Sequence, residues 1–228
     1  MMTLEEAVEL RHSVRSFTDE PLSEEVVAAL QEKIAEVNED ALLDIQLVQD
    51  EPKAFTGFKA RFGRFSGARN YLVLVGPECK ELDEVCGYFG EKLVLLAQQL
   101  GLNSCWVGGT YRMVAHQFRV DMGCKLAAII ALGYGETQGE PHRSKAPEQV
   151  APEYATAPSW FKRGVETALL APTALNQQKF AFQLAGQRQD GTPLVKATTK
   201  RGAFAKMDLG IAKLHFEIGA GDTAFDWA

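Results

Sequence analysis

A long amphipathic segment in the middle of the chain constrains the fold more than any other feature. Between residues 81 and 100 the apolar side chains recur at helical spacing, and Gly101 follows as a stop signal. The residues in phase are Leu82, Val85, Phe89, Leu93, Leu96, Ala97 and Leu100. Because a helix with such a stripe must bury it against other elements, we expect this segment at the centre of a layered fold.

Further helices and buried strands surround that segment. Thr3–Glu6 is a capping box that begins a short helix over 4–11, and Ser23 begins a second helix that reaches Val37. Strands are expected at 43–47, 71–75, 104–107, 126–132, 179–185 and 193–198, and later helices at 111–119, 159–170 and 205–218. Helices and strands mixed in this order predict an α+β fold rather than repeated βαβ units.

The sequence also predicts two units of unequal size. Four of the nine prolines fall within 141–158, which indicates an extended connector, so we expect a first unit over 1–155 and a second over 156–228. Two helix ends share a spacing, Leu93-x2-Leu96-x3-Leu100-Gly101 and Ile211-x2-Leu214-x3-Ile218-Gly219. Any amphipathic helix with a glycine stop can have this spacing, so it does not by itself establish a duplication.

Charge is distributed unevenly along the chain. The formal net charge is −6, yet no carboxylate occurs between Glu51 and Glu78 or within 191–207. Cations gathered in this way suit either a phosphorylated small ligand or two solvated loops. Phenylalanines alternate with cations in 58–69, as in some surfaces for single-stranded nucleic acid. The acidity of the whole chain, with a pI of about 5.3, argues against a nucleic-acid partner.

Nothing in the sequence points to a membrane, a secreted protein or a metal site. No apolar run is long enough for a membrane span, the first residues lack the apolar core of a signal peptide, and the four cysteines form no CxxC pair. His116 and His215 have no ligand-type residue four positions on, so both are expected to be structural or exposed. We therefore expect a cytoplasmic protein without a membrane partner.

Three short segments are candidates for ligand binding. Arg11-His12-Ser13-Val14-Arg15 follows the first helix with two guanidiniums and a hydroxyl, which suits a phosphate, although cations that cap a helix end are an alternative. Gly108 and Gly109 follow a buried strand and let the backbone approach a flat ligand, or form a tight turn. Arg143 and Lys145 in the connector are exposed cations unless an anion meets them.

The third segment, 171–178, places three adjacent amides between an apolar helix and an apolar strand. Amides offer both a donor and an acceptor, which suits the edge of a heteroaromatic ring. A turn that Asn176 holds together is the structural alternative. The segment reads Ala171-Pro172-Thr173-Ala174-Leu175-Asn176-Gln177-Gln178.

Together these segments resemble the flavin-dependent nitroreductase family. The resemblance covers most of the chain. It comprises Arg11-x-Ser13-x-Arg15, the long helix ending in Leu100-Gly101-Leu102, Ser104–Gly109, the strand ending Leu132–Glu136, Arg143 with Lys145, and the Ala-Pro-Thr-Ala-Leu-Asn-Gln-Gln segment. The resemblance implies a nitroreductase-like fold and flavin mononucleotide (FMN) as the cofactor.

One departure from the family pattern is informative. In ordinary nitroreductases the Ala-Pro-x-x-x-Asn segment follows the second helix, and this segment reaches the flavin of the partner subunit. At the corresponding place, residues 34–40, this chain has a different sequence, Ile-Ala-Glu-Val-Asn-Glu-Asp. Here the segment lies in the second unit. The chain is therefore similar to the single-chain subfamily with two fused, diverged halves. This similarity implies an intrachain pseudo-dimer with one flavin per chain, for which a monomer is sufficient.

The resemblance also implies roles for residues. Arg11, Arg143 and Lys145 would neutralise the FMN phosphate, Ser13 and its neighbour His12 would lie beside it, and Arg15 would face the pyrimidine edge of the ring and tune it. Gly108 and Gly109 would approach flavin N5, and the other half would close the ring with Pro172, Thr173, Asn176 and Gln178. The resemblance implies that the flavin carries the chemistry, with no nucleophile or general base from the protein.

The implied reaction transfers hydride from NAD(P)H through flavin N5 to a small organic acceptor such as a nitroaromatic or a quinone. The cationic stretch Lys59–Arg69 is a candidate lid for the reductant's phosphates. A protein that stores or senses flavin without turnover is the alternative, because such a protein would keep the same binding residues.

Overall fold

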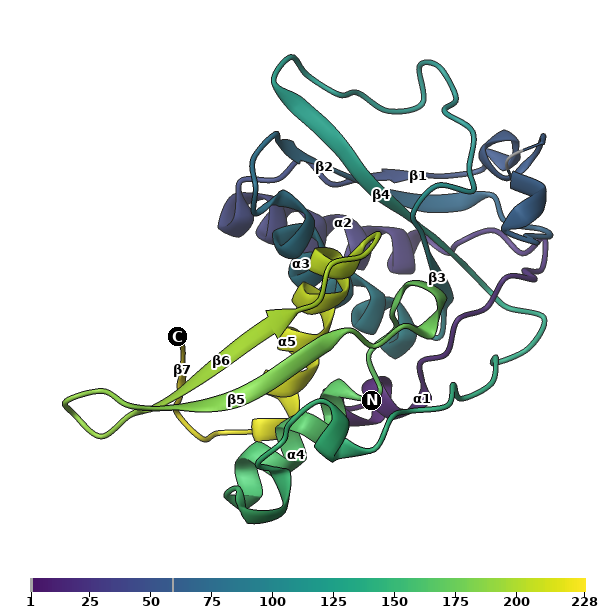
Figure 1. Cartoon of the computed structure of the whole chain (residues 1–228). Helices are drawn as coiled ribbons and strands as arrows, with labels where there is room; N and C mark the ends of the chain where they lie inside the picture. The colour runs from purple at the N-terminus through teal and green to yellow at the C-terminus, as the bar shows by residue number, and fades with distance from the viewer. Residues whose placement is uncertain (1, 59) are drawn as a thin grey trace.

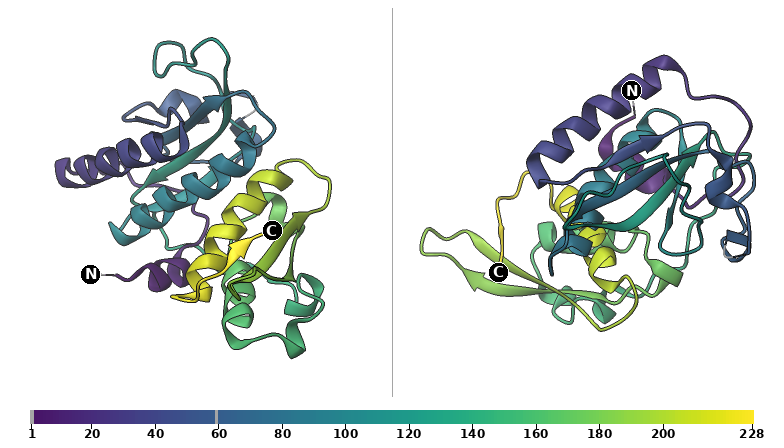
Figure 2. Two further views of the ribbon diagram at one scale, coloured as in Figure 1. Left: turned by 90° about the vertical axis from the view of Figure 1, so that its left-hand side faces the viewer. Right: turned by 90° about the horizontal axis from the view of Figure 1, so that it is seen from above.

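The computed structural model describes residues 2–58 and 60–228 of the chain. Its larger sheet is antiparallel with the strand order β1-β2-β4-β3. The strands are β1 (Gln46–Val48), β2 (Asn70–Pro77), β3 (Asn103–Val107) and β4 (Cys124–Gly133). Helices α2 (Glu24–Ala41) and α3 (Leu82–Gln99) pack on one face of this sheet (Figures 1 and 2).

Strand β2 is buried on both faces. Leu72 and Leu74 pack toward α2 and α3, whereas Tyr71, Val73 and Val75 pack against the segments that cross the opposite face. Two short 3₁₀ helices lie in one of these crossing segments, Pro52–Phe55 and Ala60–Phe62. A strand covered on both sides explains the continuous apolar run that predicted it.

The second unit contains a smaller sheet. Strands β5 (Phe180–Gln187) and β6 (Pro193–Thr199) form an antiparallel hairpin, and β7 (Asp226–Trp227) pairs parallel to β6. Helices α4 (Ser159–Ala168) and α5 (Ala205–Ala220) pack on each other, and α5 also contacts the hairpin (Figure 1). Four phenylalanines form the buried centre: Phe161, Phe180, Phe182 and Phe216.

The two units pack through α3 and α5, whose backbones approach closely (Figure 2). A Cβ on Gly87 would lie 2.1 Å from the carbonyl oxygen of Met207, and a Cβ on Gly210 would lie 1.9 Å from that of Glu84. Each helix thus contributes one glycine where only glycine fits. The main hydrophobic core runs without a break from α2 and the larger sheet into α4, α5 and the hairpin.

The N-terminal helix α1 (Leu4–Leu10) packs against both α3 and α5. Its capping box is present as predicted: Glu6 N–H donates to Thr3 Oγ1 at 3.2 Å, and Thr3 N–H donates to Glu6 Oε2 at 2.7 Å. The connector between the units holds 3₁₀ turns at Pro147–Gln149 and Tyr154–Thr156.

The predicted helix over 111–119 is wrong. This part of the chain makes turns, with His116 at a φ of 65°. Three apolar side chains of this segment with helical spacing, Tyr111, Val114 and Phe118, pack from the loop onto the outer face of the larger sheet. Their helical spacing therefore reflects contacts with the sheet, without helical hydrogen bonds. None of the described helices is long and apolar enough to cross a membrane.

Candidate cofactor site

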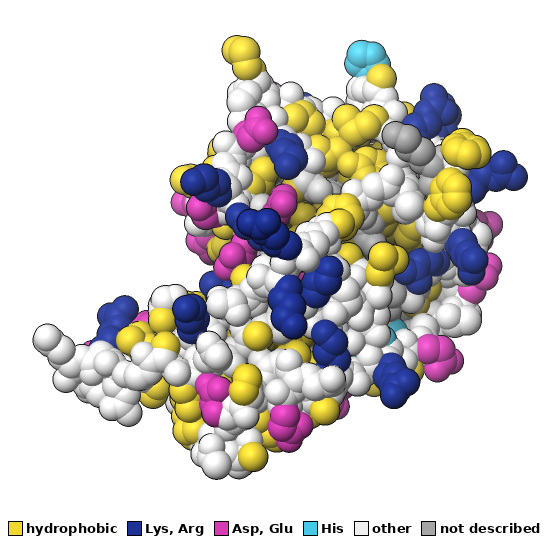
Figure 3. All heavy atoms as spheres, viewed as in Figure 1, with side chains coloured by type: hydrophobic (Ala, Val, Ile, Leu, Met, Phe, Trp, Pro, Cys, Tyr) yellow, Lys and Arg dark blue, Asp and Glu magenta, His cyan; other side chains and the backbone are white. Residues whose placement is uncertain are grey.

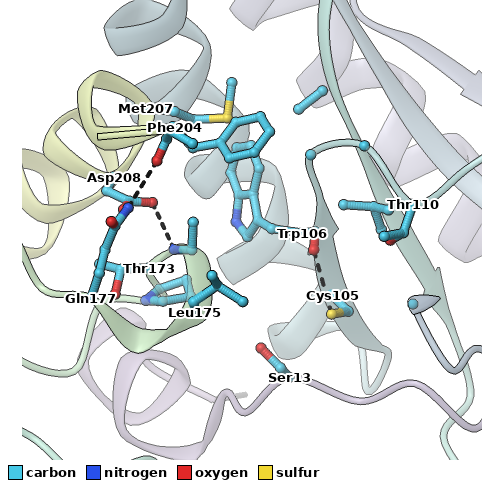
Figure 4. A pocket seen from close by; sticks show the side chains of 18 of the residues that line it. Ser13, Cys105, Trp106, Thr110, Thr173, Leu175, Gln177, Phe204, Met207 and Asp208 are labelled. Atoms are coloured by element: carbon cyan, nitrogen blue, oxygen red, sulfur yellow. Dashed lines mark hydrogen bonds between the residues drawn. The ribbon is translucent and has the colours of Figure 1, made fainter. Parts of the chain in front are cut away.

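Two adjoining cavities lie between the two units. The first has a volume of about 370 Å³ and a largely apolar lining that includes Trp106, Val107, Phe204 and Met207. The second has a volume of about 540 Å³, and Arg11, His12, Arg15 and His142 line it. Five residues line both cavities and form their junction: Ser13, Arg15, Pro172, Thr173 and Leu175. Figure 4 shows the first cavity with Ser13, Cys105 and Trp106 facing Thr173, Leu175 and Asp208 across it.

The segment after α1 reaches the site because it pairs with β3. Ser13 forms a parallel bridge with Ser104, and Val14 N–H donates to the Ser104 carbonyl at 3.0 Å. This pairing sets Ser13 and Arg15 beside the end of β3, where Gly108 and Gly109 follow. Two motifs that lie about ninety residues apart in the sequence thus form one wall.

Gly108 is in contact with an aromatic ring of the second unit. A Cβ at this position would lie 2.3 Å from Cζ of Phe204, whereas a Cβ on Gly109 would meet no atom of the described residues within 4 Å. Phe204 precedes α5 with a φ of 59° and stays 38% exposed. The glycine pair therefore has two different roles, since the first allows the two units to meet and the second leaves open space.

The opposite wall is a strained turn that includes the 3₁₀ helix Ala174–Asn176. Leu175, Asn176 and Gln178 have φ values of 54°, 53° and 43°, in the left-handed region that residues other than glycine seldom adopt. Leu175 is also fully exposed and stands at the junction of the two cavities. Strained residues of this kind concentrate at ligand clamps.

The three amides of this segment hold the turn together. Asn176 Nδ2 donates to the Arg143 carbonyl at 2.9 Å, and Gln178 Nε2 donates to the same carbonyl at 2.9 Å. Gln177 Nε2 donates to the Ala203 carbonyl at 2.9 Å and to Asp208 Oδ2 at 2.8 Å. The structural alternative for these amides is thus realised, although Asn176 still lines the second cavity and Gln177 the first.

Asp208 anchors the turn from α5. Its Oδ1 accepts the Ala174 N–H at 2.9 Å, and its Oδ2 accepts from Gln177 (Figure 4). Burial raises the pKa of Asp208, while the bonds from Ala174 and Gln177 and the nearby Lys179 lower it. Asp208 is thus a buried carboxylate whose hydrogen bonds hold the wall of the first cavity in place.

Arg11 is buried and lies against an acid of α3. Its Nε lies 3.6 Å from Glu91 Oε1, and its Nη2 donates to the Leu170 carbonyl at 3.4 Å, at the end of α4 rather than of α1. Glu91 also accepts from Trp106 Nε1 at 2.8 Å and pairs with His215 Nε2 at 3.0 Å. Desolvation lowers the pKa of Arg11, and the charge of Glu91 opposes that shift. This network ties both units to the cavity walls.

The second cavity is basic. Burial lowers the pKa values of His12 and His142, and the positive charge of Arg11 lowers both further. Glu140 also lines the cavity. Among the residues that the structure describes, the buried Arg11 Nε has no hydrogen-bond partner, since Glu91 Oε1 at 3.6 Å is an ion-pair contact only. The guanidiniums of Arg11 and Arg15, together with the ring N–H groups of His12 and His142, offer hydrogen-bond donors that suit an anion in this cavity.

Three of the predicted residues lie outside both linings: Arg143, Lys145 and Gln178. Lys145 Nζ donates to the Gln177 carbonyl at 3.0 Å and to that of Gln178, and the Gln178 side chain accepts the Lys145 N–H. Arg143 is exposed and contacts the turn through its carbonyl. Their contact with a ligand stays a prediction.

Both acid-free stretches contribute to the first cavity. Phe62, Gly63 and Phe65 come from the first stretch, and Ala203, Phe204 and Met207 come from the second. Lys59, part of the predicted lid, lies outside the described residues.

Four wall residues were not predicted from the sequence: Trp106, Leu175, Phe204 and Asp208. Among the described residues no group of three or more His, Cys, Asp or Glu could hold a metal ion.

Comparison with known proteins identifies the family. A family of sequences described as "Putative TM nitroreductase" matches residues 3–220. A nitroreductase from Thermotoga maritima, described as putative, has a TM-score of 0.66 at 22% identity, over 94% of this chain and 82% of that chain. No protein of curated function matches the sequence.

Shorter nitroreductases align with a smaller part of the chain. One from Desulfovibrio desulfuricans, described as putative and solved in complex with FMN, has a TM-score of 0.51 at 21% identity, over 64% of this chain and 94% of that chain. A family protein from Streptococcus pneumoniae has a TM-score of 0.52 at 16% identity, over 65% and 98%. The resemblance and the α+β fold of two packed units are confirmed, and the chain belongs to this nitroreductase family.

Proposed function

We propose that this protein is an FMN-dependent oxidoreductase that uses NAD(P)H to reduce a small organic acceptor. The observation that carries the proposal is the pair of adjoining cavities, one largely apolar and one basic, which share Ser13, Arg15 and Leu175. A ligand with a flat ring at one end and a phosphate at the other matches both. The family supplies the chemical class, since its members are named for nitroreduction.

Features of the site fit FMN. Within the described part of the chain, the buried Arg11 Nε lacks a hydrogen-bond partner, and the exposed Leu175 offers apolar surface at the junction. A phosphate carries nearly two negative charges and accepts several hydrogen bonds, so Arg11, His12 and Ser13 would hold it, with Arg143 nearby. When bound, FMN would supply the redox chemistry of the reaction, hydride transfer through N5 from the nicotinamide to an acceptor such as a nitroaromatic or quinone.

The remaining roles belong to side chains of both units. Arg15 would lie at the pyrimidine edge, where its positive charge stabilises negative charge on the ring. Gly109 would leave room for a flat ligand to approach the backbone at the end of β3, because a Cβ there meets only open space. Pro172, Thr173 and Asn176 would close the site from the second unit. One chain thus holds one complete site, and we propose that a monomer is sufficient for binding.

The absorption spectrum of the purified protein, before and after heat release of any ligand, tests the cofactor. We expect a flavin band and about one FMN per chain in the supernatant. A colourless protein that also fails to bind added FMN would contradict the proposal. Stopped-flow mixing of the FMN-loaded protein with NADH or NADPH tests turnover. If neither reduces the flavin, storage or sensing becomes the better account.

The lid is tested separately. Arg61 and Arg64 flank Phe62 and Gly63 at the first cavity, so their charges would attract the reductant. Replacing both by Ala should raise the KM for the reductant and leave the FMN content unchanged. An unchanged KM would remove this role.

A further inference from the structure

We propose that three cations of the second unit, Lys179, Lys200 and Arg201, bind the phosphates of a dinucleotide reductant and make NADPH the preferred form. This inference rests on the proposed function, because the dinucleotide would bring its nicotinamide to the first cavity. The three residues are called the phosphate rim below. They lie outside both cavity linings.

The phosphate rim is held together by backbone contacts where β5 begins and β6 ends. Lys200 N–H donates to the Lys179 carbonyl at 3.2 Å, and Lys179 Nζ donates to the Arg201 carbonyl at 3.3 Å. A Cβ on Gly202 would lie 2.4 Å from Lys179 Nζ, so this ammonium lies directly over the chain that leads to Phe204. In Figure 3 Lys and Arg side chains gather in the middle of the face, where Figure 1 places these strand ends.

One carboxylate, the buried Asp208, lies near Lys179 and offsets only part of the positive charge at the phosphate rim. Within the described residues none of its three members forms an ion pair. Asp208 is the carboxylate that faces Lys179, and its two oxygens already accept bonds from Ala174 and Gln177. Lys145 lies close by, and burial together with Lys200 and Lys179 lowers its pKa. An anion from solution would relieve this crowding.

The position of the phosphate rim suits a ligand that extends out of the first cavity. Gln177, Ala203 and Phe204 line that cavity and lie two or three positions from Lys179 or Arg201 in the sequence. The second cavity opens on a different set of residues, with Arg11 and His142, so the FMN phosphate and this anion would not compete. A dinucleotide whose nicotinamide enters the first cavity therefore has its phosphates within this cationic region.

The number of cations in the phosphate rim favours NADPH, which has three phosphates, over NADH, which has two. The diphosphate of NADH carries two negative charges, and the 2′-phosphate of NADPH adds nearly two more. Lysine ammoniums act as point charges on phosphates, and arginine can contact one bidentately. Three cations exceed the two negative charges of a diphosphate, so the additional phosphate should gain most from them.

The test uses the FMN-loaded protein and titrates it with NADP⁺ and NAD⁺ in a calorimeter. We expect NADP⁺ to bind roughly tenfold more tightly than NAD⁺, and that preference to disappear in the variant Lys179→Gln/Lys200→Gln/Arg201→Gln. A matched control removes three exposed cations elsewhere, Lys53→Gln/Lys125→Gln/Arg163→Gln, and should keep the preference. FMN affinity should stay the same in both variants.

Each outcome bears on the proposal. Equal NADP⁺ affinity in the wild type and the phosphate-rim variant would overturn it, and so would inorganic pyrophosphate or an oligonucleotide binding more tightly than NADP⁺. If the protein does not take up FMN at all, the proposed function fails, but adenosine 2′,5′-bisphosphate still tests the site on the apoprotein. Loss of its binding in the phosphate-rim variant alone would support the site without the enzyme.

Discussion

The two units of this chain share a plan but build their halves of the candidate site differently. Each places one long helix at the centre, α3 in the first unit and α5 in the second, and these helices pack on each other. The first unit forms its wall from the end of a strand and the segment paired to it, with Ser13 bridged to Ser104. The second unit uses a strained turn, in which Leu175 has a φ of 54°.

The difference shows how a site can form within one chain. A strand end is positioned by the sheet, so the first unit needs few additional contacts to hold Gly108 and Gly109. The turn of the second unit lies before β5 and is held by Asp208 and three amides. We therefore expect damage to the second wall to affect ligand binding more than stability, and damage at the contact between units to affect both.

The largest effect is expected where one buried acid serves both units. Glu91→Leu removes the acceptor of Trp106 Nε1 and the ion-pair partner of Arg11 and His215. Arg11 and His215 are buried, and Trp106 is half-buried. Loss of one member of such a network should lower the free energy of unfolding by about 3–5 kcal/mol. Urea unfolding at equilibrium measures this.

Glu84→Gln is the matched control, because Glu84 lies on the same helix and pairs with Lys213 at 3.0 Å nearer the solvent. A surface pair contributes about 1 kcal/mol or less. Equal losses in the two variants would show that the Glu91 network does not hold the units together.

The next effect concerns the close approach of α3 and α5. Gly210→Ala would place a Cβ 1.9 Å from the Glu84 carbonyl oxygen, so the helices must separate. Overpacking of this kind typically costs about 1–3 kcal/mol. We expect a lower melting temperature and a lower FMN content.

Gly109→Ala serves as the control for stability, since its Cβ would meet only open space. If Gly210→Ala melts at the wild-type temperature, the backbone contact between the units is looser than described.

A loss of stability of similar size, together with a clear loss of binding, is expected from Asp208→Ala. The Ala174 N–H and the Gln177 amide would lose their acceptor, at a cost of about 1–3 kcal/mol. We expect FMN to bind roughly tenfold more weakly, because the turn would be mobile in the free variant and the entropy lost on ordering it would reduce the binding free energy. Flavin fluorescence titration measures the affinity. Asp190→Ala, which removes a bond to Thr192 N–H in the hairpin turn, should leave it unchanged.

The smallest change in stability is expected at the strained residue itself. Asn tolerates the left-handed region better than Leu, so Leu175→Asn should be neutral or stabilising by up to about 1 kcal/mol. The same variant removes an exposed apolar side chain from the junction of the cavities and should weaken FMN binding several-fold. Unchanged binding would mean that Leu175 makes no contact with the ligand.

Much of the fold was predictable from local patterns. Apolar periodicity located α3 and α5, the capping box located the start of α1, and continuous apolar runs located β2 and β4. These signals work because each depends on neighbours in the sequence. The same reasoning failed at 111–119, where three side chains with helical spacing pack on a distant sheet instead.

The candidate site was predictable only in outline. The Arg-x-Ser-x-Arg motif, the glycine pair and the Ala-Pro-Thr-Ala-Leu-Asn segment all reach the cavities. Gln178 and Lys145 do not line them, because Gln178 bonds to the connector and Lys145 to the turn. Phe204 and Asp208 carried no motif, since each acts through a contact with a residue far away in the sequence.

Residue types and their spacing therefore determined the helices, the strands, the family and the segments able to meet a ligand. Tertiary structure alone decided which wall each segment forms, that Arg11 is buried beside Glu91, and that Gly108 lies against Phe204. The physical reason is that periodicity records which side of an element is buried, whereas cavity walls arise from packing between units. That packing depends on close approaches such as Gly210 against Glu84.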